Sequence, residues 1–175
     1  MISKNESDTR QIGIKMQILA WLVFLLIVGV YLQEKIESRK NHNETPETIL
    51  GQNEIKEVHL RQNRLGHYTV KGEINGFAVI FLVDTGATGV AIPGSIAKKL
   101  SLPLGKRLKT STAAGDTIAY LSRLEMVKVG NIELTDVDAA IVPKMETEYI
   151  LLGMSFLKHI ELIQRDGFLT LRQIG

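Results

Sequence analysis

One acidic residue follows an apolar run directly and opens a turn that contains glycine. Residues 81–88 read FLVDTGAT, so Asp84 stands where an apolar strand should end. We expect the strand end to hold the carboxylate rigidly, and Gly86 to allow a backbone turn that a side chain would hinder. The small neighbour Ala87 leaves room for a second copy of the loop. Asp84 is therefore the predicted catalytic residue.

A carboxylate of this kind does chemistry when it is paired with another. Two carboxylates held about 3 Å apart cannot both ionise, so the pair shares one proton. The charged member can take a proton from a water molecule while the neutral member donates to the carbonyl oxygen of a peptide bond. Peptide hydrolysis then needs neither a metal nor a covalent intermediate. The sequence contains only one such loop, so we expect the second acid to be Asp84 of another copy in a homodimer.

A structural turn is the competing interpretation, because Asp, Thr and Gly are ordinary turn residues. The apolar run before Asp84, the Ala-Thr after Gly86, and a second motif downstream favour catalysis. This second motif is YILLG at residues 149–153, followed by MSFL.

With these motifs the chain resembles the retropepsin-like aspartic proteases, in particular their single-span bacterial branch. The shared segments are VDTGAT, an Ala-rich AAG at 113–115 and LLGMSFL, and the resemblance covers about residues 68–171. It implies a small closed β-barrel, a polypeptide substrate and a loop that the apolar-apolar-Gly strand passes. The residues that would support the loop are Thr85, Gly86, Ala87, Thr88, Leu152 and Gly153. The residues that would form the tip of a substrate-covering flap are Ala113, Ala114, Gly115 and Asp116.

Three points leave alternatives open. Thr88 stands where the best-known viral members have an acid, which affects the bonds that brace the loop and not the acid pair. The proposed flap has no distinctive chemistry and could be a surface hairpin. A non-catalytic peptide- or protein-binding module of the same fold is the second functional hypothesis, since a fold does not dictate a function.

Composition limits the organisation of the chain. Its 175 residues carry a net charge of +2 and are 45% hydrophobic, which suits one domain with appendages. There is no cysteine, hence no disulfide and no thiolate metal site.

The appendage is N-terminal. Residues 16–33 carry no charge and would reach about 27 Å as a helix, about the thickness of a bilayer core. We expect a cytoplasmic tail at 1–15, a transmembrane anchor at 16–33, a linker at 34–53 and the protease domain at 54–175. A cleaved signal peptide is the rival, but residues 28–31 lack a small-x-small cleavage site.

The flanking charges give only a small preference for the orientation of the expected anchor in the membrane. Basic residues flank the apolar run almost equally, and the free amino terminus tips the balance towards an inside N-terminus. The resemblance then implies a single-pass protein of the inner membrane with its protease domain in the periplasm.

The rest of the sequence predicts an all-β fold with one or two short helices. Apolar residues alternate on both sides of Asn75-Gly76, which indicates a hairpin with a type I′ turn leading into the acid loop. Further strands are expected at 55–60, 90–92, 121–129, 132–137 and 139–142, with a last hairpin at 160–171. Short helices are expected at 95–100, with Ser95 as a possible cap, and from 153 to about 159.

Other chemistries lack their motifs. The four histidines show no His-Glu-x-x-His pattern, and Asp136 and Asp138 alone are too few oxygen ligands for calcium. No phosphate loop, no Gly-x-Ser-x-Gly elbow and no aromatic-rich basic patch occurs. We therefore expect no metal, no cofactor and no nucleic-acid partner.

Overall fold

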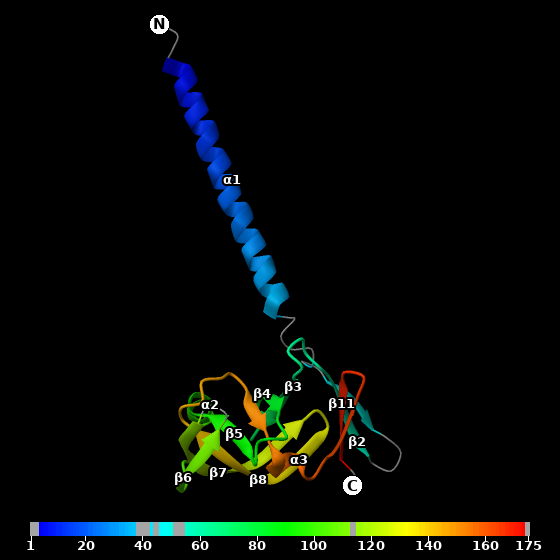
Figure 1. Cartoon of the computed structure of the whole chain (residues 1–175). Coiled ribbons are helices and arrows are strands. Elements are labelled where there is room, and N and C mark those ends of the chain that lie inside the picture. Colours follow the sequence, from blue (N-terminus) through cyan, green and yellow to red (C-terminus); the bar gives the residue numbers. More distant parts are fainter. Residues whose placement is uncertain (1–3, 38–42, 44–45, 51–54, 113–114, 174–175) are drawn as a thin grey trace. The chain divides into compact units, whose positions relative to one another are not determined.

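Figure 1 shows the computed structural model of the chain, which describes residues 4–37, 43, 46–50, 55–112 and 115–173. The chain divides into two compact units, Met1–Lys40 and Asn41–Gly175.

The first unit contains the helix α1, Lys4–Glu37. Most of its large apolar side chains from Met16 to Tyr31 are exposed. The helix starts inside the segment 1–15 that was expected to be a tail. Among the described residues, no helix combines the length and the apolar character needed to cross a membrane. Membrane attachment stays a prediction.

The second unit is mostly β, as the sequence predicts. Its strands are β1 (Glu47–Leu50), β2 (Lys56–Arg61), β3 (Thr69–Ile74), β4 (Phe77–Val83), β5 (Val90–Pro93), β6 (Arg107–Thr112), β7 (Gly115–Val129), β8 (Ile132–Val142), β9 (Ile150–Leu152), β10 (Glu161–Arg165) and β11 (Phe168–Gln173). Its short helices are α2 (Gly94–Lys99) and α3 (Met154–Leu157).

The strands form two sheets. The larger has the order β3-β4-β9-β5-β8-β7-β6, and β3 also pairs with β7. The strands from β3 to β7 in this order therefore form a closed ring of pairings, and β6 pairs with β7 outside the ring. The smaller sheet has the order β1-β2-β11-β10. Fully buried side chains such as Phe81, Leu124 and Phe156 fill the core.

The hairpin that leads to the acid loop is confirmed. Asn75 (φ 50°) and Gly76 (φ 82°) both have the positive φ that a type I′ turn requires. The Asn75 side-chain oxygen also accepts a hydrogen bond from Met126 N at 3.0 Å, and Asn75 N donates to Met126 O at 3.0 Å. These bonds fix the turn to β7, so β4 enters the acid loop in a defined direction.

The expected linker at 34–53 contains structure that the sequence does not predict. Strand β1 lies inside the expected linker and pairs with β2. The buried Asn43 side chain donates to Arg61 O at 2.9 Å and Thr69 O at 2.8 Å, and accepts from Arg61 N at 2.7 Å. Asn43 thus attaches the segment to the start of β3 and the end of β2.

Several boundaries also differ from expectation: strand β7, for example, begins at Gly115 and not at Leu121. Helix α2 begins at Gly94, and Pro93, whose ring presets its φ of −57°, takes the N-cap position without a side-chain cap, so Ser95 is not the cap. Helix α3 ends at Leu157 and not near His159. Strand β8 runs without interruption where two strands, 132–137 and 139–142, were expected. Asp136 has a φ of 62°, but pairing with β7 continues on both sides of it.

Candidate active site

Asp84 lies at the end of β4, beside the parallel strand β9. Val83 pairs with Leu152 in this ladder, and Asp84 N donates to Leu152 O at 3.2 Å. The strand of the downstream motif therefore passes the acid loop, as the resemblance implies. Leu152 is buried, so the carbonyl group that positions Asp84 is itself held in the core.

The loop is a tight turn around the Asp84 carboxyl group. Gly86 N donates to Asp84 Oδ1 at 2.9 Å, and Ala87 N donates to Asp84 O at 3.3 Å. Gly86 does not have a positive φ, so the expectation that its backbone conformation requires glycine is wrong; a Cβ atom there would instead lie 3.2 Å from Asp84 Oδ1. Asp84 and Ala87 are half-buried, whereas Thr85, Gly86 and Thr88 are exposed. The turn thus holds one carboxylate oxygen by a backbone N–H and presents the acid at the surface.

Gly153 supports this turn because the backbone approaches it too closely for any side chain. A Cβ atom at Gly153 would lie 2.1 Å from Gly89 O and 2.7 Å from Ala87 O. Directly after it, Met154 N donates to Ala87 O at 2.9 Å. The far end of the acid loop therefore lies against the start of α3.

Ser155 is a supporting residue that sequence reasoning missed. Its hydroxyl group donates to Asp138 O at 2.7 Å and accepts from Val90 N at 3.0 Å. One side chain thus links α3, β8 and the first residue of β5, where the acid loop ends. The single local signal is a polar residue within the apolar run MSFL.

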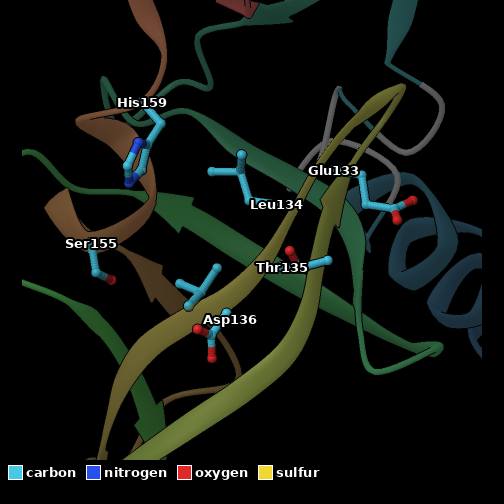
Figure 2. Close-up of a pocket in the computed structure, with 7 residues that line it drawn as sticks. Glu133, Leu134, Thr135, Asp136, Ser155 and His159 are labelled. Carbon is cyan, nitrogen blue, oxygen red and sulfur yellow. The ribbon is translucent and has the colours of Figure 1, made fainter.

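A pocket that Ser155 helps to line lies between β8 and α3 (Figure 2). It encloses about 240 Å³. Its lining residues are Glu133, Leu134, Thr135, Asp136, Val137, Ser155 and His159. Asp84 does not line this pocket, so it is separate from the acid loop.

Two aspartates at or beside this pocket are paired with one arginine. Arg123 on β7 binds the Asp136 carboxylate through Nε and Nη2, and its Nη1 lies 3.1 Å from Asp138 Oδ1. Hydrogen bonding to Arg123 lowers the pKa of Asp136 below its usual range and raises the pKa of Arg123. Both aspartates are mostly exposed, and they bind one guanidinium group.

The predicted flap corresponds to the hairpin of β6 and β7, which pair from Arg107 with Tyr120 to Thr112 with Gly115. Gly115 (φ 105°) and Asp116 are exposed. Ala113 and Ala114 lie outside the described residues. The hairpin is confirmed, and its role over a substrate stays a prediction.

No cluster of three or more His, Asp or Glu side chains that could hold a metal ion occurs within the described part of the chain. The chemistry available here is that of a braced, surface-facing carboxylate at a strand end.

Comparison with known proteins gives concordant results. The sequence profile of a family described as "gag-polyprotein putative aspartyl protease" matches residues 70–159, which include the acid loop and β9. A solved retropepsin-like aspartic protease from Rickettsia conorii is similar over 73% of this chain and 94% of that chain, with 26% identity and a TM-score of 0.58.

A curated Sinorhizobium relative, an uncharacterized protein from the cobV 5' region, is 32% identical over 121 residues. The match covers 67% of this chain and 52% of the relative, so the chain spans about half the length of that protein.

Proposed function

The chain belongs to this family of gag-polyprotein-type aspartyl proteases, and on that premise we propose that it is an aspartic endopeptidase whose active site contains Asp84 from two copies. The observation that carries the proposal is the position of Asp84. Its carboxylate opens an exposed turn that β9 and α3 brace through backbone contacts. A carboxylate that only capped a turn would not need this support from distant segments.

In the proposed reaction, the two Asp84 carboxyl groups share one proton and hold a water molecule between them. The charged carboxylate takes a proton from this water, and the neutral carboxyl group donates to the carbonyl oxygen of the scissile peptide bond. The oxygen of the water bonds to the carbonyl carbon, and the carboxyl group that took its proton then gives that proton to the amide nitrogen. The C–N bond breaks and the amine leaves, while the other carboxylate takes back a proton from the tetrahedral intermediate as the new carboxylic acid forms. The role proposed for the β6–β7 hairpin, with Gly115 and Asp116 near its tip, is to cover the bound polypeptide and exclude water.

The homodimer is part of the proposal because one chain supplies one acid loop. Two-fold symmetry brings the second Asp84 without a second motif in the same chain. Thr85, Gly86 and Thr88 are exposed, so these faces of the loop are open to a partner copy.

We also propose that α1 attaches the enzyme to a membrane as a single span, as in the bacterial branch of the family, with the protease domain on the periplasmic side of the inner membrane. The exposed apolar side chains from Met16 to Tyr31 support attachment. Carbonate extraction of membranes tests it, because recovery of the intact chain in the soluble fraction would contradict the anchor.

The central experiment compares the full chain with Asp84→Asn on a mixed peptide library. The amide nearly preserves size but cannot accept the proton of water, so we expect cleavage to fall by about 10³-fold or more with the fold intact. Cleavage by Asp84→Asn at the parental rate would falsify the protease assignment. A chain that binds peptides in both forms without cleaving them would be the binding module instead.

A mixing experiment tests the shared site. When the parental chain is mixed with an excess of Asp84→Asn chains, heterodimers contain one acid, so activity per parental chain should fall below that of the parental chain diluted alone. Activity per chain that stays constant on dilution, with only monomer in sedimentation, would contradict the two-copy site.

A further inference from the structure

The outer face of the smaller sheet carries two arginines on either side of an exposed aromatic ring. Phe168 on β11 pairs with Arg61 on β2 and with Arg165 on β10. Residues directly opposite each other in antiparallel strands place their side chains on the same face. Phe168 is 49% exposed, so an apolar ring lies between two cationic side chains in contact with water.

The loop that follows β2 adds an exposed leucine beside this row. Gln62 N donates to Gly167 O at 2.9 Å, which joins this loop to the β10–β11 turn. The Asn63 side chain accepts hydrogen bonds from Leu65 N and His67 N, both at 2.9 Å. These bonds order the loop while Leu65, which is 79% exposed, remains in solvent.

We call the group Arg61, Arg64, Leu65, Arg165 and Phe168 the turn-end patch. Its three arginines are exposed, and its only acidic neighbour in the β10–β11 turn, Asp166, pairs with Arg165 at 3.2 Å. Leu65 lies in the loop after β2 and Phe168 is the first residue of β11, and the hydrogen bond from Gln62 to Gly167 joins that loop to the turn before Phe168. Single exposed apolar residues are common on protein surfaces, but a cluster bordered by cations indicates a binding surface.

The opposite end of the same face has the opposite charge. There Arg172 pairs with Glu57 at 2.6 Å and with Glu161 at 3.1 Å, which leaves one negative charge in excess. The sheet face is therefore polarised along its strands, with cations at the turn end and excess carboxylate at the far end. Such a polarity favours one orientation on a negatively charged surface.

The chain also enters this unit at the turn end. Asn43, near the start of the second unit, hydrogen-bonds the backbone of Arg61, the patch residue at the end of β2. Asn43 is thus held beside the patch.

We propose that the turn-end patch docks the protease domain on an anionic lipid surface, with Leu65 and Phe168 in the interface and the arginines on lipid phosphates. This arrangement of exposed apolar side chains flanked by basic residues matches the chemistry of a lipid interface. The proposal rests on the proposed membrane attachment and is independent of proteolysis. Docking would hold the domain in one orientation relative to the membrane.

The test uses a single fluorescent label on the full chain, which has no cysteine of its own. The cysteine of the Leu65→Cys variant is labelled with nitrobenzoxadiazole, a dye whose emission depends on its environment. The labelled chain is then reconstituted into vesicles of phosphatidylcholine, with or without about one third phosphatidylglycerol. Phe77→Cys is the matched control, because Phe77 is also exposed (56%) but lies away from the patch. It pairs with Ile74 at the end of β3, whereas Asn43 binds Thr69 at the start of β3. We expect a blue shift at position 65 in anionic vesicles only, and no shift at position 77.

Charge variants sharpen the result. Each arginine near an anionic membrane changes the docking equilibrium about fivefold, so Arg61→Gln with Arg64→Gln should weaken docking about 25-fold. Arg107→Gln on β6 removes an exposed arginine elsewhere and should leave the shift unchanged.

Several results would overturn the proposal. One is the absence of a shift at position 65 in anionic vesicles, and another is the same shift at position 77. A third is an equal shift at position 65 in neutral vesicles that grows with protein concentration, and this result would assign the patch to a contact between copies. Vesicle co-flotation reports attachment separately from docking. Asp84→Asn should leave the label response unchanged, so failure of the protease assignment and failure of docking are distinguishable.

Discussion

The acid loop and the middle of the β7–β8 hairpin both place an aspartate in a backbone turn or kink, but different forces hold them. Around Asp84 the contacts are made mainly by backbone atoms of β9 and α3, together with the Ser155 hydroxyl group. Asp136, at a φ of 62°, is instead 68% exposed and bound by Arg123, which is 60% exposed.

This difference has consequences for function. Backbone hydrogen bonds and steric contacts do not titrate and are little affected by salt, so they suit a loop whose geometry decides catalysis. An exposed ion pair contributes little to stability and is screened by salt. We therefore expect catalysis to depend on the first group of contacts, and only acid stability to depend on the second.

Gly153→Ala should have the largest effect of the three substitutions that test this comparison. The new methyl group would lie 2.1 Å from Gly89 O, and moving this backbone displaces the acid loop. The glycine has a φ of −95°, which alanine adopts, so the cost is steric. We expect a loss of about 3 kcal/mol in unfolding free energy and near-complete loss of cleavage. Denaturant unfolding and a peptide assay measure both.

Gly167→Ala is the control for the introduced methyl group. Gly167 has a φ of 79° with no heavy atom within 4 Å of a Cβ, so only backbone strain of about 1 kcal/mol is expected. Its cleavage rate should equal that of the parental chain. Equal losses in the two variants would mean that close packing at Gly153 is not what shapes the loop.

Local sequence patterns explain which parts of this site could be predicted. The alternation around Asn75-Gly76 and the apolar run before Asp84 are local signals, and both led to correct elements. The partners of Ser155 could not be found in this way, because Val90 lies 65 residues away in the chain. The same holds for Asn43, whose bonds to Arg61 and Thr69 exist only after β2 and β3 are in place.

Ser155→Ala should have an intermediate effect. It leaves Val90 N without its hydroxyl acceptor and removes the donor to Asp138 O. A lost partner for a partly buried group costs about 1–3 kcal/mol, and a looser end of the acid loop should lower kcat more than it raises KM. Steady-state kinetics give the two constants separately.

Ser122→Ala is the matched control, because its hydroxyl group also donates to a backbone oxygen, Pro103 O, but in an exposed position. It should change the unfolding free energy by less than about 0.5 kcal/mol. If Ser155→Ala behaved like this control, its hydroxyl bridge would have no part in positioning Asp84.

Asp136→Asn should have the smallest effect and should appear only in acid. Hydrogen bonding to Arg123 lowers the folded-state pKa of Asp136 below the ordinary 3.8, so the unfolded chain takes up this proton at a higher pH than the folded one. The ion pair therefore stabilises the fold above about pH 4, and this contribution is lost as the pH falls through the lowered pKa. Asparagine keeps the size and tolerates the positive φ, so the variant should lose less stability than the parental chain between neutral and acidic pH.

Arg123→Gln should flatten the same part of the curve of unfolding free energy against pH, whereas cleavage at neutral pH should stay at the parental rate in both variants. Loss of neutral cleavage in Asp136→Asn comparable to that in Ser155→Ala would show that the acid loop depends on the surface ion pair, and would remove the distinction between the two regions.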